Sequence, residues 1–183
     1  MVAKDDYVIV LDFLPHGKSG DRKVEPLIQA VGDKFFNLLE VVIKDDIKIK
    51  PKDKIYIGAE KREEVKYIKS RIGYNDLTNF AKTELEDVIK EIIEKDEKRF
   101  VNFFNRAGPI TTRLHSLELL PGIGKKHMWE IIKNRRQKPF EDFSDLRKRV
   151  TMLPEPKNMI VKRVVDELEG KDRYKLFVGS GMM

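Results

Sequence analysis

The N-terminal third of the chain alternates short apolar runs with turn-forming residues, a pattern typical of β-strands. Residues 7–11 (YVIVL) are β-branched and aromatic, and turn residues follow them at Pro15–Gly17. The run 35–43 (FFNLLEVVI) is a second candidate strand, and a turn at Pro51–Lys54 leads into a third at 55–58. Short strands joined by such turns predict a small antiparallel barrel or curved sheet.

In the middle of the chain the apolar spacing changes to a helical period. Residues 65–72 place apolar side chains at helical spacing and predict a short helix that Gly73 ends. A longer helix is predicted to begin at Thr83, the N-cap of a capping box that Glu86 completes. The aromatic run 100–104 (FVNFF) is assigned to a following helix with its rings in the core.

The most specific pattern lies within residues 111–136. A helix capped by Thr111 or Thr112 is expected to run into the sequence LPGIGKK at 120–126. Two glycines that flank one apolar residue allow a tight turn, after which the amides of a new helix point outward. Free amides and the positive end of the helix dipole favour a phosphate group there. The second helix of this hairpin carries its apolar side chains at Met128, Ile131 and Ile132.

The same stretch also fits an ordinary glycine-containing turn between two helices, with no ligand. Trp129 lies one turn into the second helix and is expected to anchor the core rather than stack on a base. His127, beside two lysines, fits either a phosphate contact or an exposed histidine near a helix start.

A second copy of the hairpin becomes visible when the sequence is shifted by 33 residues. Leu120–Pro121 then falls on Leu153–Pro154, and Met128 falls on Val161. Because one unit alone cannot bury its apolar face, two such units are expected to form one compact domain.

The second copy departs from the glycine pattern. Glu155 stands in place of Gly122 and Lys157 in place of Gly124, while Pro156 has no amide hydrogen to donate. A carboxylate at this position repels phosphate, so the second unit is expected to be mainly structural. Its candidate peripheral contacts are Lys157, Lys162 and Arg163.

The positive charge is concentrated in the C-terminal part of the chain. Residues 108–183 hold 16 Lys and Arg against 10 Asp and Glu, whereas residues 1–107 hold 21 of each. This balance fits a surface that binds a polyanion and fits equally a solvated basic face. Arg135, Arg136 and Lys138 lie in the connector between the hairpins, where they either flank a bound backbone or complement the dipole of their own helix.

Composition excludes several classes of protein. The chain has no cysteine and three histidines, so disulfides, thiolate catalysis and cysteine-based zinc sites are excluded and no metal site is expected. No apolar run approaches the length of a membrane span, and no clustered carboxylates suggest catalysis. We expect a cytoplasmic protein that is not an enzyme.

The LPGIGKK hairpin resembles the helix-hairpin-helix superfamily, whose members bind nucleic acid through phosphate contacts without reading bases. The resemblance implies that Gly122, Gly124 and Lys125 contact phosphate and that Ile123 packs between the helices. In some members hairpin carbonyls hold a monovalent cation. Here those carbonyls would come from around 120–123. No other cofactor is expected.

The whole chain resembles an archaeal family, domain of unknown function 655. The resemblance is carried by residues 6–12 (DYVIVLD), 15–17 (PHG), the hairpin and 174–178 (YKLFV). It implies an oligonucleotide-binding-type barrel followed by a helix-hairpin-helix domain. It also implies that the gene lies near genes of translation and ribosomal RNA maturation, which favours RNA as the ligand. Residues 174–178 read as a strand that returns to the N-terminal sheet.

The sequence therefore predicts an α+β protein with a small antiparallel β-barrel followed by an all-helical tandem helix-hairpin-helix domain. The expected divisions are a barrel-like domain at 1–75, connecting helices at 76–107, the tandem domain at 108–170, and a C-terminal strand and tail at 171–183.

The expected function is binding of nucleic acid, RNA in preference to DNA, without base specificity. Two alternatives remain open, a DNA-binding protein of repair or recombination and a module that docks a protein partner. The predicted nucleic-acid-binding residues are Gly122, Ile123, Gly124, Lys125, Lys126, Arg135, Arg136, Lys138 and Lys157.

Overall fold

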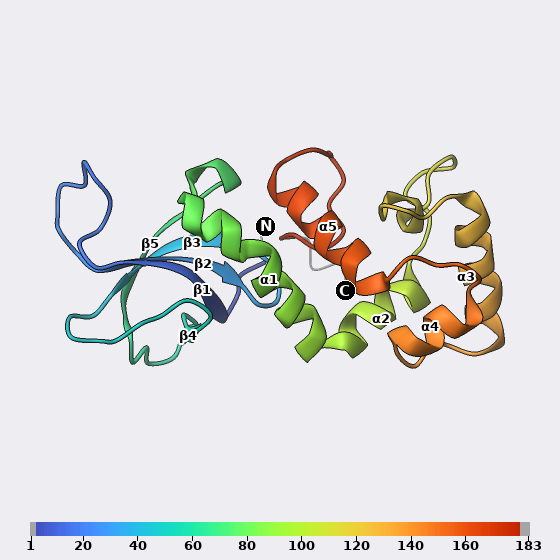
Figure 1. Cartoon of the computed structure of the whole chain (residues 1–183), viewed down its shortest axis with the longest axis horizontal. Helices are drawn as coiled ribbons and strands as arrows, with labels where there is room; N and C mark the ends of the chain where they lie inside the picture. Colours follow the sequence, from blue (N-terminus) through green and yellow to red (C-terminus); the bar gives the residue numbers. More distant parts are fainter. Residues whose placement is uncertain (1–2, 180–183) are drawn as a thin grey trace. The chain divides into compact units, whose positions relative to one another are not determined.

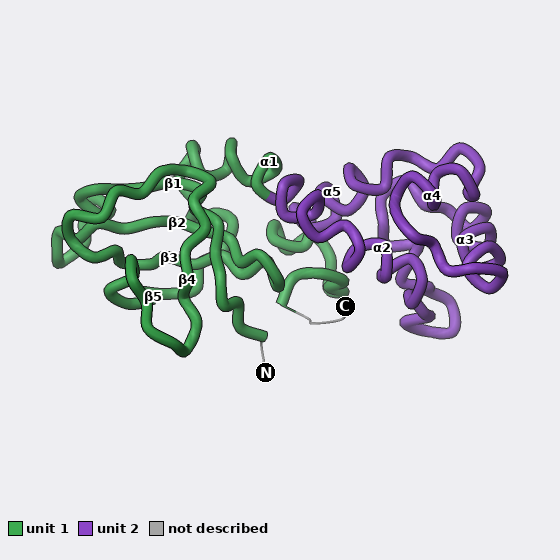
Figure 2. Tube along the Cα trace, turned by 90° about the horizontal axis from the view of Figure 1, so that it is seen from below, with its two compact units in different colours: residues 1–88, 167–181 green, residues 89–166, 182–183 purple. Residues whose placement is uncertain are grey.

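A computed structural model describes residues 3–179 and shows a mixed α+β protein (Figure 1). The chain divides into two compact units (Figure 2). The described parts of unit 1 are residues 3–88 and 167–179, and unit 2 contains residues 89–166.

The fold of unit 1 is a five-stranded antiparallel half-barrel sheet with strand order β4-β1-β2-β3-β5. Its central strand β2 is buried along its whole length because both faces of the sheet are covered there. The strands are β1 (Tyr7–Leu14), β2 (Leu27–Gly32), β3 (Leu38–Ile43), β4 (Lys54–Tyr56) and β5 (Val65–Arg71).

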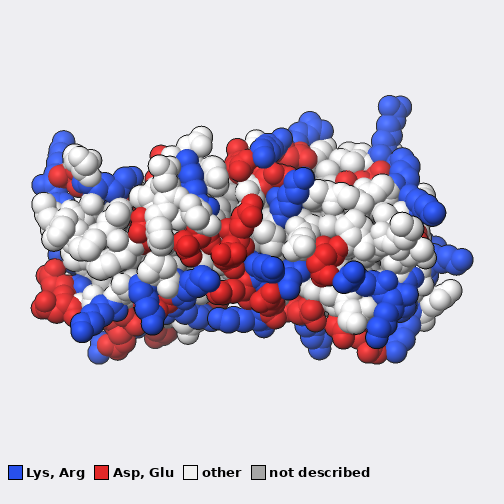
Figure 3. Space-filling model, in the orientation of Figure 1, with Lys and Arg blue, Asp and Glu red and all other residues white. Residues whose placement is uncertain are grey.

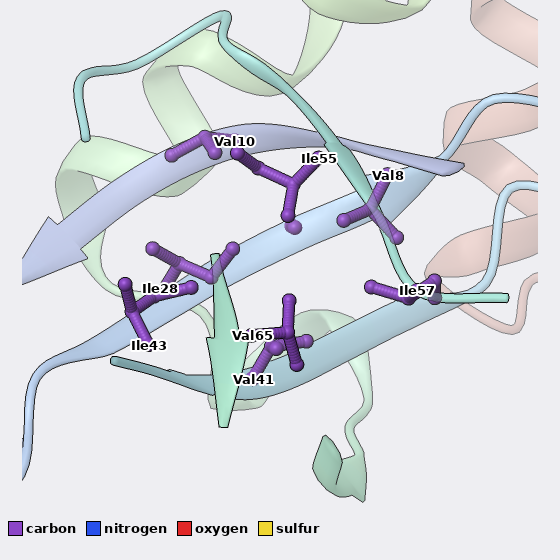
Figure 4. Packing of buried hydrophobic residues seen from close by; sticks show 9 residues of the cluster. Val8, Val10, Ile28, Val41, Ile43, Ile55, Ile57 and Val65 are labelled. Carbon is purple, nitrogen blue, oxygen red and sulfur yellow. The ribbon is translucent and has the colours of Figure 1, made fainter. Parts of the chain in front are cut away.

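One face of the sheet encloses an aliphatic core (Figure 4). Alternate residues of the strands point to this face, as the two-residue period of a strand requires. Figure 4 shows the side chains pointing toward one another from all five strands and the start of the segment after β4. The core consists of Val8, Val10, Ile28, Ala30, Val41, Ile43, Ile55, Ile57 and Val65.

The prediction of a helix at residues 65–72 was wrong, because residues 65–71 form strand β5. Strand β2 was not predicted from the sequence. Val65 and Ile68 are three residues apart, a spacing that fits a helix. Strand β3 offers a free edge to this segment, and Val41 pairs with Ile68 across the sheet. Pairing with the edge of β3 therefore outweighs the helical spacing of this segment and makes it a strand.

The helices begin after the one-turn 3-10 helix η1. Thr78 caps α1, since its Oγ1 accepts from the backbone N–H of Ala81 at 3.0 Å. The predicted cap at Thr83 was wrong, because Thr83 lies inside α1 and donates to the carbonyl of Asn79. The bounds are η1 (Tyr74–Asp76), α1 (Asn79–Lys95), α2 (Glu97–Arg106), η2 (Ser116–Leu119), α3 (Lys125–Gln137), α4 (Phe143–Arg149) and α5 (Pro156–Leu168).

A buried polar network joins the start of α1 to the sheet within unit 1. Gln29 donates to the carboxylate of Glu40 and accepts from the backbone N–H of Thr78. Thr78 also donates through its hydroxyl to Asp12 on β1 at 2.6 Å. Lys18 forms an ion pair with Glu40 at 3.0 Å, so the buried carboxylate has a cationic partner.

The segment after α5 is not a strand, so the prediction for 174–178 was wrong within the described residues. The buried carboxylate of Glu167 accepts the backbone N–H groups of Leu176, Phe177 and Val178 at 3.0–3.1 Å. These amides therefore have a side-chain acceptor and need no neighbouring strand. Residues 180–183 of the predicted tail lie outside the described part of the chain.

Candidate nucleic-acid interface

The hairpin turn between η2 and α3 lies in unit 2. The N–H of Ile123 donates to the carbonyl of Leu120 at 3.1 Å, which closes the turn. Gly122 has φ +90°, a left-handed conformation that side chains rarely adopt. Ile123 is 6% exposed and Gly124 is exposed. The apolar residue between the two glycines therefore packs inward, as the sequence pattern predicted.

The segment before this turn differs from the prediction. No α-helix runs from Thr111 or Thr112. A single 3-10 turn, η2, is instead capped by His115, whose Nδ1 accepts from the N–H of Leu117 at 3.1 Å. The carbonyl of Leu114 accepts the amides of both Ile110 and Thr111, which closes a tight loop where a helix was expected.

The N-terminus of α3 leaves its first-turn amides without a side-chain cap. Gly124 is the N-cap residue, and glycine has no side chain that could accept these hydrogen bonds. The first amide to bond within the helix is that of Met128, which donates to the carbonyl of Gly124 at 3.0 Å. Lys125 and Lys126 lie in this turn and are exposed. The turn therefore presents free donors and cationic side chains together.

The two hairpin turns of unit 2 lie against each other. A side chain at Gly122 would place its Cβ 3.1 Å from Cγ of Pro154 in the second turn. Gly122 is thus required by close packing as well as by its φ angle. The second turn also contributes Leu153, which is buried, to the interior of the unit.

The charged residues of the second turn are engaged in ion pairs. Glu155 pairs with Arg147 at 2.8 Å, and Lys157 pairs with Glu94 at 2.7 Å. The hydrogen bond from Lys157 holds the pKa of Glu94 below its usual value. Arg163 is 5% exposed and donates to the carbonyl of Leu119. Lys157 and Arg163, which were predicted as peripheral phosphate contacts, are therefore engaged within the protein and do not add exposed cations to the first turn.

The predicted cations of the first hairpin and the connector have different environments. Lys125 pairs with Glu118 at 3.0 Å, and Lys138 pairs with Glu141 at 2.8 Å. Arg135 is half-buried and donates to the carbonyl of Phe104, and burial lowers the pKa of its guanidinium. Lys126 forms no ion pair within residues 3–179, and its side chain is exposed.

The outward face of α3 continues the basic surface of the turn. With about 100° of rotation per residue, five side chains fall within an arc of about 100° that contains no acid. Within the described chain, neither Lys133 nor Arg136 forms an ion pair. We call this arc the α3 basic face, and its members are Lys125, Lys126, Trp129, Lys133 and Arg136.

Trp129 is 61% exposed, so the prediction that it anchors the core was wrong. The buried positions of α3 are Met128, Ile131 and Ile132, and they fill the opposite arc of the helix. The indole has no place on that arc because Trp129 lies beside Lys126 and Lys133 on the wheel. Trp129 and Lys133 were missing from the predicted site, and a helical wheel of 125–137 is the signal that finds them.

Figure 3 shows the distribution of charge on one side of the molecule, in the orientation of Figure 1. Lys and Arg side chains gather at the end of unit 2 over α3 and α4. On unit 1 positive and negative side chains are interspersed. The local excess of positive charge expected from the sequence is therefore displayed on the surface of unit 2.

A second group of candidate residues lies on β1 and β4 of unit 1. The rings of Tyr7 and Tyr56 meet edge to face with centroids 5.2 Å apart, and the ammonium of Lys54 lies 4.5 Å from the centre of the Tyr7 ring. Lys54 also pairs with Asp33 at 3.3 Å. These contacts satisfy the cation within the sheet, so this cluster is a weaker candidate than the α3 basic face.

No group of three or more His, Asp or Glu side chains that could hold a metal ion occurs within residues 3–179. None of the helices described there has the length and apolar character needed to cross a membrane. The carbonyl of Leu120, one of those expected to hold a monovalent cation, accepts the turn hydrogen bond from Ile123.

Comparisons with known proteins cover nearly the whole chain. It is similar to "Uncharacterized protein MJ0038" of Methanocaldococcus jannaschii, with 44% identity over 176 residues, 95% of this chain and 80% of that protein. It is also similar to the crystal structure of Af1531 from Archaeoglobus fulgidus, with 48% identity and a TM-score of 0.85. That match covers 94% of this chain and 99% of the other. A family model described as "Protein of unknown function (DUF655)" matches residues 4–179, and the chain therefore belongs to this family.

Proposed function

We propose that this protein binds the phosphate backbone of nucleic acid, RNA in preference to DNA, through the turn Gly122–Lys126 and the α3 basic face. The main support for the proposal is that the free amides and the exposed cations form one continuous surface. Uncapped amides at the start of α3 adjoin an exposed arc in which three cations, Lys126, Lys133 and Arg136, have no ion-pair partner among the described residues.

The charge arrangement supports an anionic ligand. Lysines in the first turn of a helix oppose the positive end of its dipole, so their placement costs free energy unless an anion lies near. Lys125 has such an anion in Glu118, whose pKa is lowered by hydrogen bonds from the His115 backbone and then from Lys125. Lys126 lies near Glu130, whose carboxylate accepts the backbone N–H of Thr151, and it forms no ion pair within the chain as described. A phosphate group would supply that pair.

The repeat supports a helix-hairpin-helix interpretation of unit 2. The segments η2–α3 and α4–α5 are each a short helix, a turn and a 13-residue helix, and their turns pack on each other at Gly122 and Pro154. In this interpretation the first unit contacts nucleic acid and the second supports it. The half-barrel of unit 1 is proposed to be of the oligonucleotide-binding type, with Tyr7, Tyr56 and Lys54 as its candidate surface.

The alternative, docking of a protein partner, needs a large exposed apolar patch. In the described part of unit 2 the large exposed apolar side chains are Trp129 and Met152. Two side chains are too few for the apolar centre of a stable protein interface. We therefore favour nucleic acid over a protein partner.

The test is binding of the purified protein to labelled single- and double-stranded RNA and DNA across a salt series. We expect affinity to fall steeply as salt increases, since neutralised phosphates release counterions. The double variant Lys125→Glu, Lys126→Glu should lose most of this binding while it keeps the wild-type circular dichroism spectrum. Absence of binding to all four nucleic acids, or binding that does not depend on salt, would contradict the proposal.

A further inference from the structure

The most unusual side chain of unit 2 is Trp129, which is the single tryptophan of the chain and is 61% exposed. A large aromatic side chain on a protein surface leaves much apolar area in water. The fold does not use it, because Met128, Ile131 and Ile132 fill the buried face of α3. An exposed indole at this position therefore calls for a ligand.

The surroundings of the indole are cationic. Lys126 precedes Trp129 by three residues and Lys133 follows it by four, so both side chains are its neighbours on the helix surface. Arg136 lies two helical turns after Trp129 on the same arc. None of these three cations is engaged in an ion pair within residues 3–179. The acid of this helix, Glu130, lies one turn from Lys126 and interacts with it electrostatically, but its carboxylate accepts the backbone N–H of Thr151 at 2.8 Å and forms no ion pair with Lys126.

This combination selects one kind of ligand. An aromatic face flanked by cations suits a molecule that offers an exposed π-face and anionic groups at regular spacing. An unpaired nucleotide has both, because its base can stack on the indole while the neighbouring phosphates contact the lysines. In a duplex the base faces are covered by their neighbours, so only phosphates would be available.

We propose that Trp129 is a stacking platform for an unpaired base of single-stranded nucleic acid whose phosphates lie on Lys126, Lys133 and Arg136. This inference rests on the proposed function and specifies the ligand of the same site. It implies a preference for single-stranded or locally unpaired nucleic acid over continuous duplex. The contact is to the base face, so it does not depend on base identity.

The single tryptophan makes the proposal directly measurable, because all indole fluorescence comes from the proposed site. The protein is titrated with an oligothymidylate of about ten nucleotides and with an abasic oligodeoxynucleotide of the same length. We expect the oligothymidylate to quench the fluorescence on stacking. The abasic strand, which offers phosphates without bases, should bind more weakly and leave the fluorescence nearly unchanged.

Three variants separate stacking from phosphate binding. Trp129→Ala should weaken oligothymidylate binding about 10-fold, the typical loss for one stacked base, and should leave abasic binding unchanged. Trp129→Phe should restore most of the affinity because it keeps an aromatic face. Phe80→Ala removes an aromatic side chain of unit 1 that is 48% exposed and serves as the matched control with wild-type affinity.

The outcomes are distinguishable. Equal affinity for both strands without quenching would overturn the stacking role and leave the phosphate proposal intact. Quenching that increases with protein concentration alone would show that a second copy covers Trp129, and it would also overturn the inference. Absence of binding to either strand would overturn the inference, and absence of binding to RNA as well would overturn the proposed function itself. Because Trp129 is exposed, its variants should keep the wild-type thermal midpoint, which circular dichroism checks.

Discussion

The two hairpin turns of unit 2 occupy equivalent positions in the repeat and present different chemistry. The first turn exposes Gly124 and Lys126 and leaves the amides of α3 uncapped. In the second turn Glu155 and Lys157 are held by ion pairs with Arg147 and Glu94, and Pro156 begins α5 without an amide hydrogen. Equivalent positions of the repeat therefore carry an open, basic turn in one copy and a turn with paired charges in the other.

In the proposed helix-hairpin-helix interpretation, the two copies have different roles. Each copy buries the apolar face of its long helix, so both contribute to the interior of the unit. The turn of the second copy pairs its charged side chains within the chain, so they are not available to a ligand. The first copy leaves the amides at the start of α3 uncapped and Lys126, Lys133 and Arg136 without an ion pair among the described residues, as expected of a binding surface.

The largest expected effect concerns the glycine at which the two turns meet. Gly122→Val should lower the free energy of unfolding by about 3 kcal/mol, because the new side chain meets Pro154 and the residue keeps a positive φ. Gly124→Ala is the matched control, since its Cβ would point into open space, and its effect should stay within about 0.5 kcal/mol. Urea denaturation measures both. Equal effects would show that the turns do not pack as described.

A smaller effect is expected on binding when the α3 basic face is shortened. The double variant Lys133→Ala, Arg136→Ala should weaken binding to single-stranded RNA about 10-fold. The number of neutralised phosphates, given by the slope of log affinity against log salt concentration, should fall by about two. The matched pair Lys148→Ala, Lys162→Ala removes two exposed cations of the second copy and should change affinity less than about 3-fold. Equal losses from the two pairs would show that binding does not distinguish the copies.

A third change should separate stability from binding. Gly124→Ser supplies the missing side-chain cap of α3 and should raise the free energy of unfolding by about 0.5 kcal/mol. The same hydroxyl would accept a hydrogen bond from the amides that are proposed to hold phosphate. We therefore expect affinity for nucleic acid to fall although the protein becomes more stable. A rise in both quantities would contradict the proposed role of these amides.

The smallest expected effect is a dependence of stability on pH near neutrality, which comes from a histidine of the first copy. Burial lowers the pKa of the His115 imidazole below its usual value of about 6.5. As pH falls, the unfolded chain therefore binds the proton before the folded protein does. Stability should decrease below about pH 7, and the loss is complete once pH is below the folded pKa.

His115 also accepts a hydrogen bond as the cap of η2, whereas α4 of the second copy is capped by the carboxylate of Asp142. His115→Asn keeps an acceptor that does not titrate, so it should remove less than about 1 kcal/mol of pH dependence between pH 5 and 7. Unfolding free energies of both proteins across this range measure the difference. Identical pH profiles would show that His115 is not the group responsible.

Much of unit 2 could be predicted from the sequence because its signals are local. The buried face of α3 follows from the spacing of Met128, Ile131 and Ile132. The inward position of Ile123 follows from the glycines on either side. The 33-residue repeat correctly located the second long helix, α5. Trp129 was wrongly predicted to be buried because a large aromatic side chain is usually buried. Its angular position between two lysines instead places it on the exposed face of α3.

Unit 1 was harder to predict because its structure depends on distant partners. Strand β5 reads as a helix by spacing, and only the free edge of β3 makes it a strand. Strand β2 carries Gln29 in its centre, a residue that is buried only because Glu40 and Thr78 satisfy its side chain. The segment 176–178 lacks a partner strand because a single carboxylate, that of Glu167, binds its amides.

The sequence by itself determined where glycines, cations and apolar periodicity coincide, and hence the α+β class and the first hairpin turn. These properties belong to neighbouring residues, whose spacing sets both conformation and local charge. The tertiary structure decided which cations are engaged, since Lys157 pairs with Glu94 and Arg135 donates to the carbonyl of Phe104, whereas Lys126 forms no ion pair among the described residues. Whether a charge is neutralised depends on residues far away in the chain, because electrostatic and hydrogen-bond partners are chosen by distance in space.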